Sequence, residues 1–390
     1  MDRQLRAVAA LGAALIAVSA LGVVGPAQAA SPASPAGLAS PVNSGWPHGL
    51  SDPFARRVEV AGNSGQLNGV FCTAATDCWA VGQTLTKLGR LNQVLHWTGK
   101  KWFVVSAPTP AGTLPGDENV LLDVACTSAS SCWAVGDYGT DDSTTRGEII
   151  KNQALFWNGK SWSLVSTPNP AGAKKNHANA LGSIRCASPA ECWAAGAYGV
   201  LGKKFIVRNQ MLHWTGKKWT QVLVPNLAGT TKGAFNELFG LSCTSAKSCL
   251  AVGAAENLVL MGKAVDEVLS WNGTKWRSVH VPNPDGTDPG SINGLTGVTC
   301  GAARDCWAVG TYGSMGSEPM RNQALHWTGT KWKAVSTPNP GGNGKEDRSA
   351  LSGVRCTSPA NCWAVGVHQH NNGPDRDQIL HWNGTKWSDS

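Results

Sequence analysis

The sequence predicts an all-β fold, a β-propeller of six blades with four antiparallel strands in each blade. Three observations lead to this prediction. A unit of about 57 residues recurs six times along the 390-residue chain. The apolar runs within each unit are short and rich in residues that favour strands, and turn residues separate them.

Paired Cys and paired Trp residues define the unit. The two Cys of a pair are always six positions apart, the two Trp are five apart, and 24 positions separate the second Trp from the next Cys. Only the interval from the second Cys to the first Trp varies, between 19 and 25 positions. The Cys pairs are Cys72/Cys78, Cys126/Cys132, Cys186/Cys192, Cys243/Cys249, Cys300/Cys306 and Cys356/Cys362, and the Trp pairs are Trp97/Trp102, Trp157/Trp162, Trp214/Trp219, Trp271/Trp276, Trp327/Trp332 and Trp382/Trp387.

Each strand can be placed within the unit. In the last copy the first strand covers 351–356 and ends at a Cys, the second holds C-W-A-V-G at 362–366, and the third holds Q-x-L-H-W at 378–382. The N-G or T-G that follows is a hairpin turn, because Gly accepts the positive φ of such turns. The fourth strand starts at the second Trp and ends at P-N-P, where proline lacks the donor for pairing. The copies lie near 67–110, 121–170, 181–227, 238–284, 295–340 and 351–390.

Two other architectures fit the same repeat: an open β-solenoid and a string of six independent disulfide-linked modules. A solenoid needs distinct capping units, which the sequence does not show. A ring supplies neighbours to both faces of every sheet. The last unit stops at 387–390, before its fourth strand is complete, so we expect a strand within residues 46–61 to close the last blade. The propeller would then span 46–390.

The N-terminus has the layout of a secretory signal peptide over residues 1–29, followed by a Ser/Pro/Ala-rich, disordered leader over 30–45. We therefore expect a secreted, extracellular protein. No later segment approaches the roughly 20 apolar residues of a membrane span. The net charge of +8 is spread without a Lys/Arg cluster, which argues against a nucleic-acid partner.

The order G-V-x-C, C-W-A-V-G and W-x-G-x-x-W resembles the sialidase-like, Asp-box group of secreted and lumenal propellers, particularly the photosystem assembly factor type. The resemblance covers roughly residues 67–390 and implies propeller geometry. The Asp-box acid is absent, since Asn or Thr takes its place, as at Asn158 in Asn158-Gly159-Lys160-Ser161-Trp162. Secreted repeat proteins of this Ala/Gly-rich kind are familiar from actinobacteria.

The repeated Cys, Trp and His residues are predicted to be structural. Twelve Cys in six local pairs behind a signal peptide indicate six disulfides, and the spacing is not that of a C-x-x-C redox motif. No second pair of Cys or His lies at ligand spacing, so we expect no metal and no cofactor. Trp residues that recur at one position in every blade favour packing between blades over stacking on a sugar.

Function is expected where the units differ. The variable interval lies between the second and third strands, so these loops gather on one face of the disc, which we call the loop face. A basic residue also precedes the third strand in four units. The candidate binding residues on this face are Tyr138, Asp141, Arg146, Lys151, Tyr198, Arg208, Tyr312, Arg321, His368, His370 and Arg376.

We expect a non-catalytic binding or scaffold propeller, monomeric, whose loop face binds an anionic polysaccharide, a cell-envelope component or a protein. The alternative is a glycan-active hydrolase or lyase built in the central pocket, for which Asp141, Asp142, Glu256 and Asp375 are available carboxylates. The fourth unit departs most, with Leu250 in place of Trp, Asp266-Glu267 in place of N-Q, and Ser270 in place of His. It is either a drifted blade or the docking place of a partner.

Overall fold

The computed structural model describes residues 64–86, 89–114, 116–140, 149–202, 205–257, 263–314 and 319–390. Every element named within these ranges is a strand, and there are 24 of them. They form six consecutive groups of four, which we call blades 1 to 6. Blades 1 to 3 are β1 (Ser64–Ala74), β2 (Asp77–Thr86), β3 (Gly89–Trp97), β4 (Trp102–Val104); β5 (Asp117–Ser128), β6 (Ser131–Thr140), β7 (Ile149–Trp157), β8 (Trp162–Val165); and β9 (His177–Ser188), β10 (Glu191–Val200), β11 (Ile206–Trp214), β12 (Trp219–Gln221). Blades 4 to 6 are β13 (Ala234–Ser245), β14 (Ser248–Asn257), β15 (Ala264–Trp271), β16 (Trp276–Ser278); β17 (Ser291–Ala302), β18 (Asp305–Ser314), β19 (Arg321–Trp327), β20 (Trp332–Ala334); and β21 (Arg348–Ser358), β22 (Asn361–Gln369), β23 (Arg376–Trp382), β24 (Trp387–Asp389).

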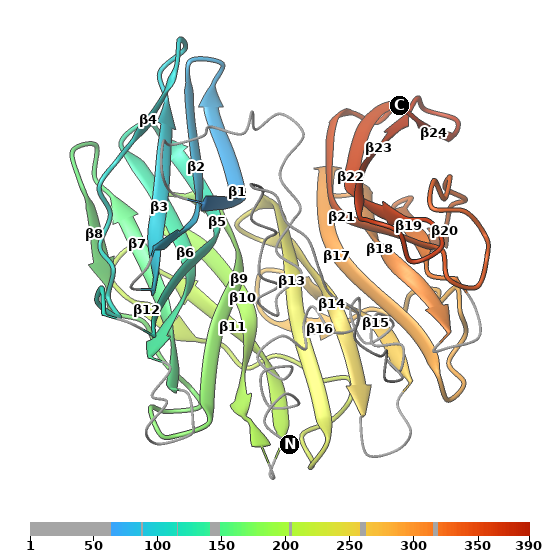
Figure 1. The fold of residues 1–390 in the computed structure, drawn as a ribbon, viewed down its shortest axis with the longest axis horizontal. Helices are drawn as coiled ribbons and strands as arrows, with labels where there is room; N and C mark the ends of the chain where they lie inside the picture. Colours follow the sequence, from blue (N-terminus) through green and yellow to red (C-terminus); the bar gives the residue numbers. More distant parts are fainter. Residues whose placement is uncertain are drawn as a thin grey trace, which may run out of the picture.

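Each blade is an antiparallel meander in which the strands pair in chain order. The first strands of successive blades pack beside one another, β1 on β5, β5 on β9, and so on to β17 on β21, so they are the innermost strands. The blades follow an arc from the blue β1–β4 to the red β21–β24 (Figure 1). The all-β propeller architecture predicted from the repeat is therefore present.

The core lies between the blades. The second strand of a blade carries a Trp that packs on both paired Trp residues of the next blade. Trp79, which is fully buried, lies 4.7 Å from Trp157 and 5.2 Å from Trp162, measured between ring centroids. Trp133, Trp193 and Trp307 make the same three-ring contact with the blade that follows each of them. We call this contact the tryptophan interlock.

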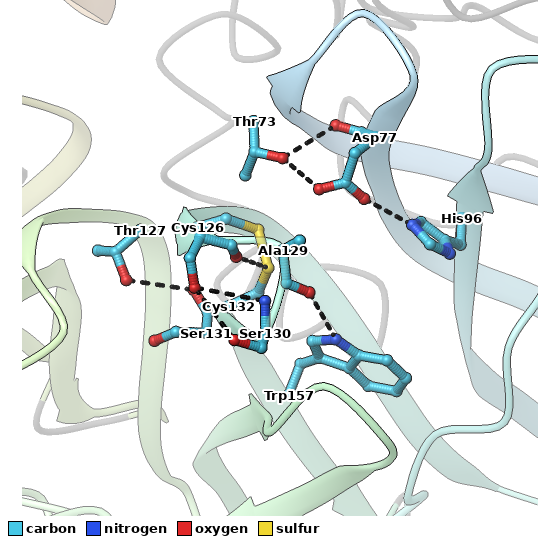
Figure 2. The surroundings of a disulfide bond; sticks show 11 residues. Thr73, Asp77, His96, Cys126, Thr127, Ala129, Ser130, Ser131, Cys132 and Trp157 are labelled. Atoms are coloured by element: carbon cyan, nitrogen blue, oxygen red, sulfur yellow. Dashed lines mark hydrogen bonds and ion pairs between the residues drawn. A yellow bond between two sulfur atoms is a disulfide. The ribbon is translucent and has the colours of Figure 1, made fainter.

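A disulfide and a tryptophan hold the first hairpin of each blade. Cys126 and Cys132 face each other across β5 and β6, and the indole Nε1 of Trp157 donates to the carbonyl of Ala129 in the hairpin turn at 3.1 Å (Figure 2). All six blades repeat both features, so the six predicted disulfides are confirmed.

Three of the disulfide cysteines on the second strands are core residues away from the loop face. Cys78, Cys192 and Cys362 are 8%, 0% and 0% exposed, and each is bonded to the Cys six positions before it. Cys192 and Cys362 lie in the apolar clusters between blades. These three residues therefore stand apart from the loop-face candidates, because burial closes their sulfur atoms to a ligand or an exchanging thiol.

The turns between the first and second strands and those between the third and fourth strands lie side by side on one face, opposite the loop face. We call it the turn face. A Cβ built on Gly159, in the turn between β7 and β8, would lie 2.9 Å from the Cβ of Ser130, in the turn between β5 and β6. On the other face, His370 after β22 contacts Asp347 before β21. The division of turns and loops between two faces, as predicted from the constant and variable spacings, is confirmed.

The last blade corrects one expectation. Its fourth strand, β24, pairs with β23 and is three residues long, the same length as β4, β12, β16 and β20. The sheet of blade 6 therefore has four strands without help from the N-terminus, and residues 46–61 lie outside the described residues.

The two ends of the arc carry unmatched halves of the tryptophan interlock. Trp363 of blade 6 is only partly buried, unlike the four Trp residues that reach a following blade, and Asp377, further along the same sheet, is exposed. On blade 1, Trp97 and Trp102 are both partly buried, whereas the counterparts of Trp102 in the other five blades are buried. Among the described residues, no substantial contact joins β21 to β1.

The glycine of C-W-A-V-G is required by a close approach of two strands. A β-bulge in the first strand, between Leu295 and Gly297 in blade 5, turns the carbonyl of Gly294 toward Gly310 on β18. A Cβ on Gly310 would overlap that carbonyl oxygen. The five other blades have the same bulge and the same overlap at their own glycine, so this position tolerates no side chain.

Replacing Gly310 by Ala should lower the free energy of unfolding by roughly 1–3 kcal/mol, because the added methyl group forces the two strands apart. Gly301→Ala is the matched control, since Gly301 is exposed and a Cβ there meets nothing closer than 3.9 Å. Urea titration of both variants measures the difference. Equal stability of the two would contradict the overlap.

Candidate functional site

The candidate residues of the loop face form cross-strand pairs, one on each of four blades. Each pair joins an aromatic residue at the end of the second strand to a basic residue at the start of the third. The pairs are Tyr138 with Lys151, Tyr198 with Arg208, Tyr312 with Arg321, and His368 with Arg376. In the first, Lys151 Nζ lies 5.9 Å from the centre of the Tyr138 ring. The basic residues sit on the third strand of four different blades, two strands away from the axis, so they do not line one central funnel.

The remaining candidates take separate places. His370 Nδ1 lies 2.9 Å from Asp347 Oδ1, and Asp347 also accepts from the amide of Asn371, so this histidine belongs to a loop junction of blade 6. Asp375 is exposed in the loop before β23. Asp141, Asp142 and Arg146 lie outside the described residues.

A carboxyl with a strongly raised pKa lies on an innermost strand. Glu237, on β13, is partly buried, and burial together with the negative charge of Asp137 raises its pKa from 4.5 to about 8. Asp137 lies on β6 of blade 2, so the charge of a carboxylate on a non-adjacent blade acts on Glu237. At neutral pH Glu237 therefore holds a proton while Asp137 supplies negative charge.

Neither acid stands out in the sequence, because both occupy repeat positions. Glu237 stands six positions before its Cys, where the other blades have Gln66, Val120, Ala180, Gly294 and Ala350. Asp137 stands five positions after its Cys, where the others have Gln83, Ala197, Ala254, Thr311 and Val367. The available signal was a single acid at a repeat position that is neutral in the other five units. The sequence does not show that these two repeat positions act on each other; the fold does.

Glu256 is a second acid with a raised pKa. It is buried at the end of β14, and burial raises its pKa to about 7. Three other blades have glycine at this position, Gly139, Gly199 and Gly313, where a Cβ would press on the neighbouring third strand. Glu256 was among the carboxylates considered from the sequence.

Two arginines on the innermost strands of different blades act on each other through their charges. Arg185, on β9, donates to Asp123 at 2.8 Å. The pKa of Arg355, on β21, is lowered, first by the surrounding protein and second by the positive charge of Arg185. The two guanidinium groups therefore lie near one another although blades 3 and 6 are not adjacent. Such a pair attracts a carboxylate or sulfate.

Pairs of amide side chains link neighbouring blades on the third strands. Asn92 donates to Gln153 at 2.8 Å and Gln153 donates back at 3.0 Å, and Asn322 and Gln378 form the same reciprocal pair. Each Gln also donates to backbone carbonyls of its own blade, for example Gln153 to Val120. The amides of the repeated N-Q dipeptide thus satisfy one another inside the core.

Blade 4 replaces both amides with acids. Asp266 accepts a hydrogen bond from Gln323 of blade 5, and Glu267 accepts one from the amide of Leu227 at 3.2 Å. Burial raises the pKa of Glu267 to about 8 and that of Asp266 well above its usual value. Glu267 is paired with Asn209 of blade 3, and Asp266 is paired with Gln323 of blade 5. In these two pairs four oxygen atoms remain without a hydrogen-bond partner: Glu267 Oε2, Asn209 Oδ1, Asp266 Oδ1 and Gln323 Oε1. A proton on each acid turns one carboxyl oxygen of each pair into a donor, so the protonated acid can replace the amide.

The residues described contain no group of three or more His, Cys, Asp or Glu side chains placed to hold a metal ion. No helix in the same part of the chain is long and apolar enough to cross a membrane.

Glu267→Gln should stabilise the protein at pH 9 by on the order of 3 kcal/mol. Below pH 4.5 the carboxyl is protonated in both the folded and the unfolded chain. As the pH rises from 4.5 to about 8, the unfolded chain loses the proton while the folded chain keeps it, so the free energy of unfolding falls. Denaturant titrations from pH 4 to pH 9 should show a smaller fall in the variant.

The control for this prediction is Glu346→Gln, which changes an exposed carboxyl and should leave the pH dependence of the wild type unchanged. Parallel stability curves for Glu267→Gln and the wild type would contradict a protonated Glu267.

Neither a protein-family model nor a curated protein sequence matches the chain. Solved structures do match. A polysaccharide lyase of family PL25, an ulvan lyase bound to -[GlcA(1-4)Rha3S]-, is 8% identical, with a TM-score of 0.51 over 82% of this chain and 81% of the lyase. An α-L-arabinofuranosidase from Fusarium graminearum is 10% identical, with a TM-score of 0.46 over 82% of this chain and 96% of that enzyme. The chain spans 54% of a GH74 xyloglucanase from Xanthomonas campestris, which is 9% identical over 83% of this chain with a TM-score of 0.39.

The match to the ulvan lyase supports the predicted fold, while the assembly-factor type and the actinobacterial origin stay predictions. The expectation of a non-catalytic binding or scaffold propeller is corrected by the match with a TM-score above 0.5, because that match is a polysaccharide lyase. At such low identity the likeness itself concerns the fold.

Proposed function

We propose that the protein is a glycan-active enzyme, a hydrolase or lyase, whose acid groups are Glu237 and Asp137 on the inside of the arc. The observation that carries the proposal is the position of Glu237 on the innermost strand β13, where burial and the charge of Asp137 raise its pKa to about 8. Breaking a glycosidic bond needs a proton donor for the leaving oxygen, and a carboxyl that keeps its proton at neutral pH suits this role.

Asp137 has the complementary role. For hydrolysis, its carboxylate takes a proton from the water that attacks the anomeric carbon, while Glu237 gives its proton to the leaving oxygen. For elimination, a base removes a proton from the sugar ring and Glu237 again protonates the leaving group. In both reactions the two carboxyls must differ in protonation, which is the effect that Asp137 has on Glu237.

The arginines support an anionic glycan as the substrate. Arg185 and Arg355 lie on the same set of innermost strands as Glu237, and each comes from a different blade. Uronic acid and sulfate groups bind to guanidinium through charge-assisted hydrogen bonds. A polysaccharide that carries such groups is therefore favoured over a neutral one.

Glu237→Gln and Asp137→Asn should each lower turnover by roughly a hundredfold or more, since each removes one half of the acid–base pair. Wild-type turnover should also fall as the pH rises through about 8, where Glu237 loses its proton. The assay measures reducing ends for hydrolysis and ultraviolet absorbance of unsaturated products for elimination, on a panel of uronic acid, sulfated and neutral polysaccharides.

Asp375→Asn, at an exposed aspartate of the loop face, is the matched control and should keep wild-type turnover. Full activity of Glu237→Gln would remove this residue from the mechanism. A wild type that cleaves nothing in the panel would contradict the proposed activity.

We also propose secretion, as the signal-peptide layout of residues 1–29 predicts. Six disulfides among the described residues support an oxidising compartment, because thiols stay reduced in the cytosol of most organisms.

We propose further that the arc closes into a ring of six blades, with blade 6 packed directly on blade 1. The unmatched halves fit each other: Trp363 lacks a following Trp pair, and Trp97 with Trp102 lacks a preceding Trp. Asp377 holds the position of Asn322, and Gln93 is 9% exposed with its Oε1 unpartnered, in the position of Gln378.

A double-mutant cycle between Asp377→Ala and Gln93→Ala should show a coupling energy of roughly 0.5–3 kcal/mol, because the ring brings the two side chains into contact. The cycle between Asn322→Ala and Gln378→Ala, whose side chains are already hydrogen-bonded, is the reference. Denaturant unfolding measures both. If the effects of Asp377→Ala and Gln93→Ala are additive while the reference pair shows clear coupling, the proposed contact between blades 6 and 1 is contradicted.

A further inference from the structure

The interface between blades 4 and 5 lacks one ring of the tryptophan interlock. Where blade 3 has Trp193, blade 4 has Leu250, and where blade 3 has His213 stacked on that indole at 4.0 Å, blade 4 has Ser270. Leu250 and Ser270 are cross-strand neighbours on β14 and β15. The volume that Trp and His side chains fill in blade 3 is therefore left empty at a single position.

The paired Trp residues of blade 5 keep their places around this space. Trp327 donates its indole N–H to the carbonyl of Ala303 in the hairpin turn of its own blade, as its counterparts do in the other five blades. It lies 5.9 Å from Trp332, close to the spacing of the other Trp pairs. The Trp pair of blade 5 is thus in place, while the single indole that packs on such a pair at the other interfaces is absent.

A cavity of about 140 Å³ results. Leu250, Val279, Trp327 and Trp332 form its apolar wall, and the hydroxyl-bearing Ser242 and Ser270 are among the residues around it. An engineered apolar cavity of about 150 Å³ in another protein binds benzene, so a cavity of this size accepts one aromatic ring system. The hydroxyls offer partners to a ring N–H or O–H, which the fully apolar positions of the other indoles do not.

We propose that this cavity is a binding site for an indole-sized planar aromatic group. The ligand takes the place that Trp193 takes between blades 3 and 4, with its ring against Trp327 and Trp332. The lining residues Cys249 and Ala303 belong to the first hairpins of blades 4 and 5, so the site opens on the turn face, away from the loop face. The site does not depend on the acids proposed for catalysis.

Equilibrium dialysis with indole tests the proposal on the full-length, oxidised protein. Wild type should bind one equivalent. The variant Leu250→Trp with Ser270→His fills the cavity with the side chains of the neighbouring blades, so it should bind indole at least tenfold more weakly and melt at a higher temperature. Absence of indole binding to wild type, or equal binding by wild type and the filled variant, would overturn the proposal.

A transplanted cavity is the matched second variant. Trp193→Leu with His213→Ser copies blade 4 into blade 3, and it should add a second equivalent of bound indole. Failure of this variant to fold leaves the comparison between wild type and the filled variant intact.

Two further probes identify the source of the aromatic group. Tighter binding of a tripeptide Gly-Trp-Gly than of indole would support the site and indicate a tryptophan side chain of a partner protein. Methyl β-glucoside has a ring of similar size without aromatic character. Binding of the glucoside with no binding of indole would overturn the proposal and indicate a sugar site.

Discussion

The tryptophan interlock is the contact on which the rest of the structure depends. A blade has no core of its own, since its sheet is one layer thick, and its apolar residues become buried only against its neighbours. The interlock supplies most of that burial at one end of the blade: four Trp residues with at most 2% exposure each pack on two further indoles. The disulfide and the indole–carbonyl hydrogen bond of each blade then hold the first hairpin at the position where the next indole packs.

Much of this could be predicted from the sequence because the determinants are local. A separation of six positions between two Cys defines a hairpin, and a separation of five between two Trp defines another, so strands, disulfides and turn faces follow from the spacing alone. The end of the last blade was predicted wrongly for a physical reason. The P-N-P motif predicts a fourth strand that runs up to the proline, whereas the strand observed is only three residues long, as at Trp387–Asp389.

The candidate site could not be predicted in the same way. Glu237 and Asp137 are 100 positions apart, on blades that are not adjacent in the chain, and each occupies a position that is neutral in the other five units. The variable loops drew attention because they differ in length, but the perturbed acids are single substitutions inside regular strands. Blade 4 shows the same principle, since Leu250 and Ser270 were visible as departures from the repeat while the space between them and Trp327 required coordinates.

The tryptophan interlock also has a direction. The leading face of a blade carries the single indole and the trailing face carries the pair, so the two faces of a blade are complementary to each other and neither is complementary to itself. Two identical ends therefore cannot join, and any blade that keeps both halves can follow any other such blade. A gene that gains or loses one repeat by recombination would encode a chain whose new junction already matches. The number of blades can then change during evolution without the invention of a new interface.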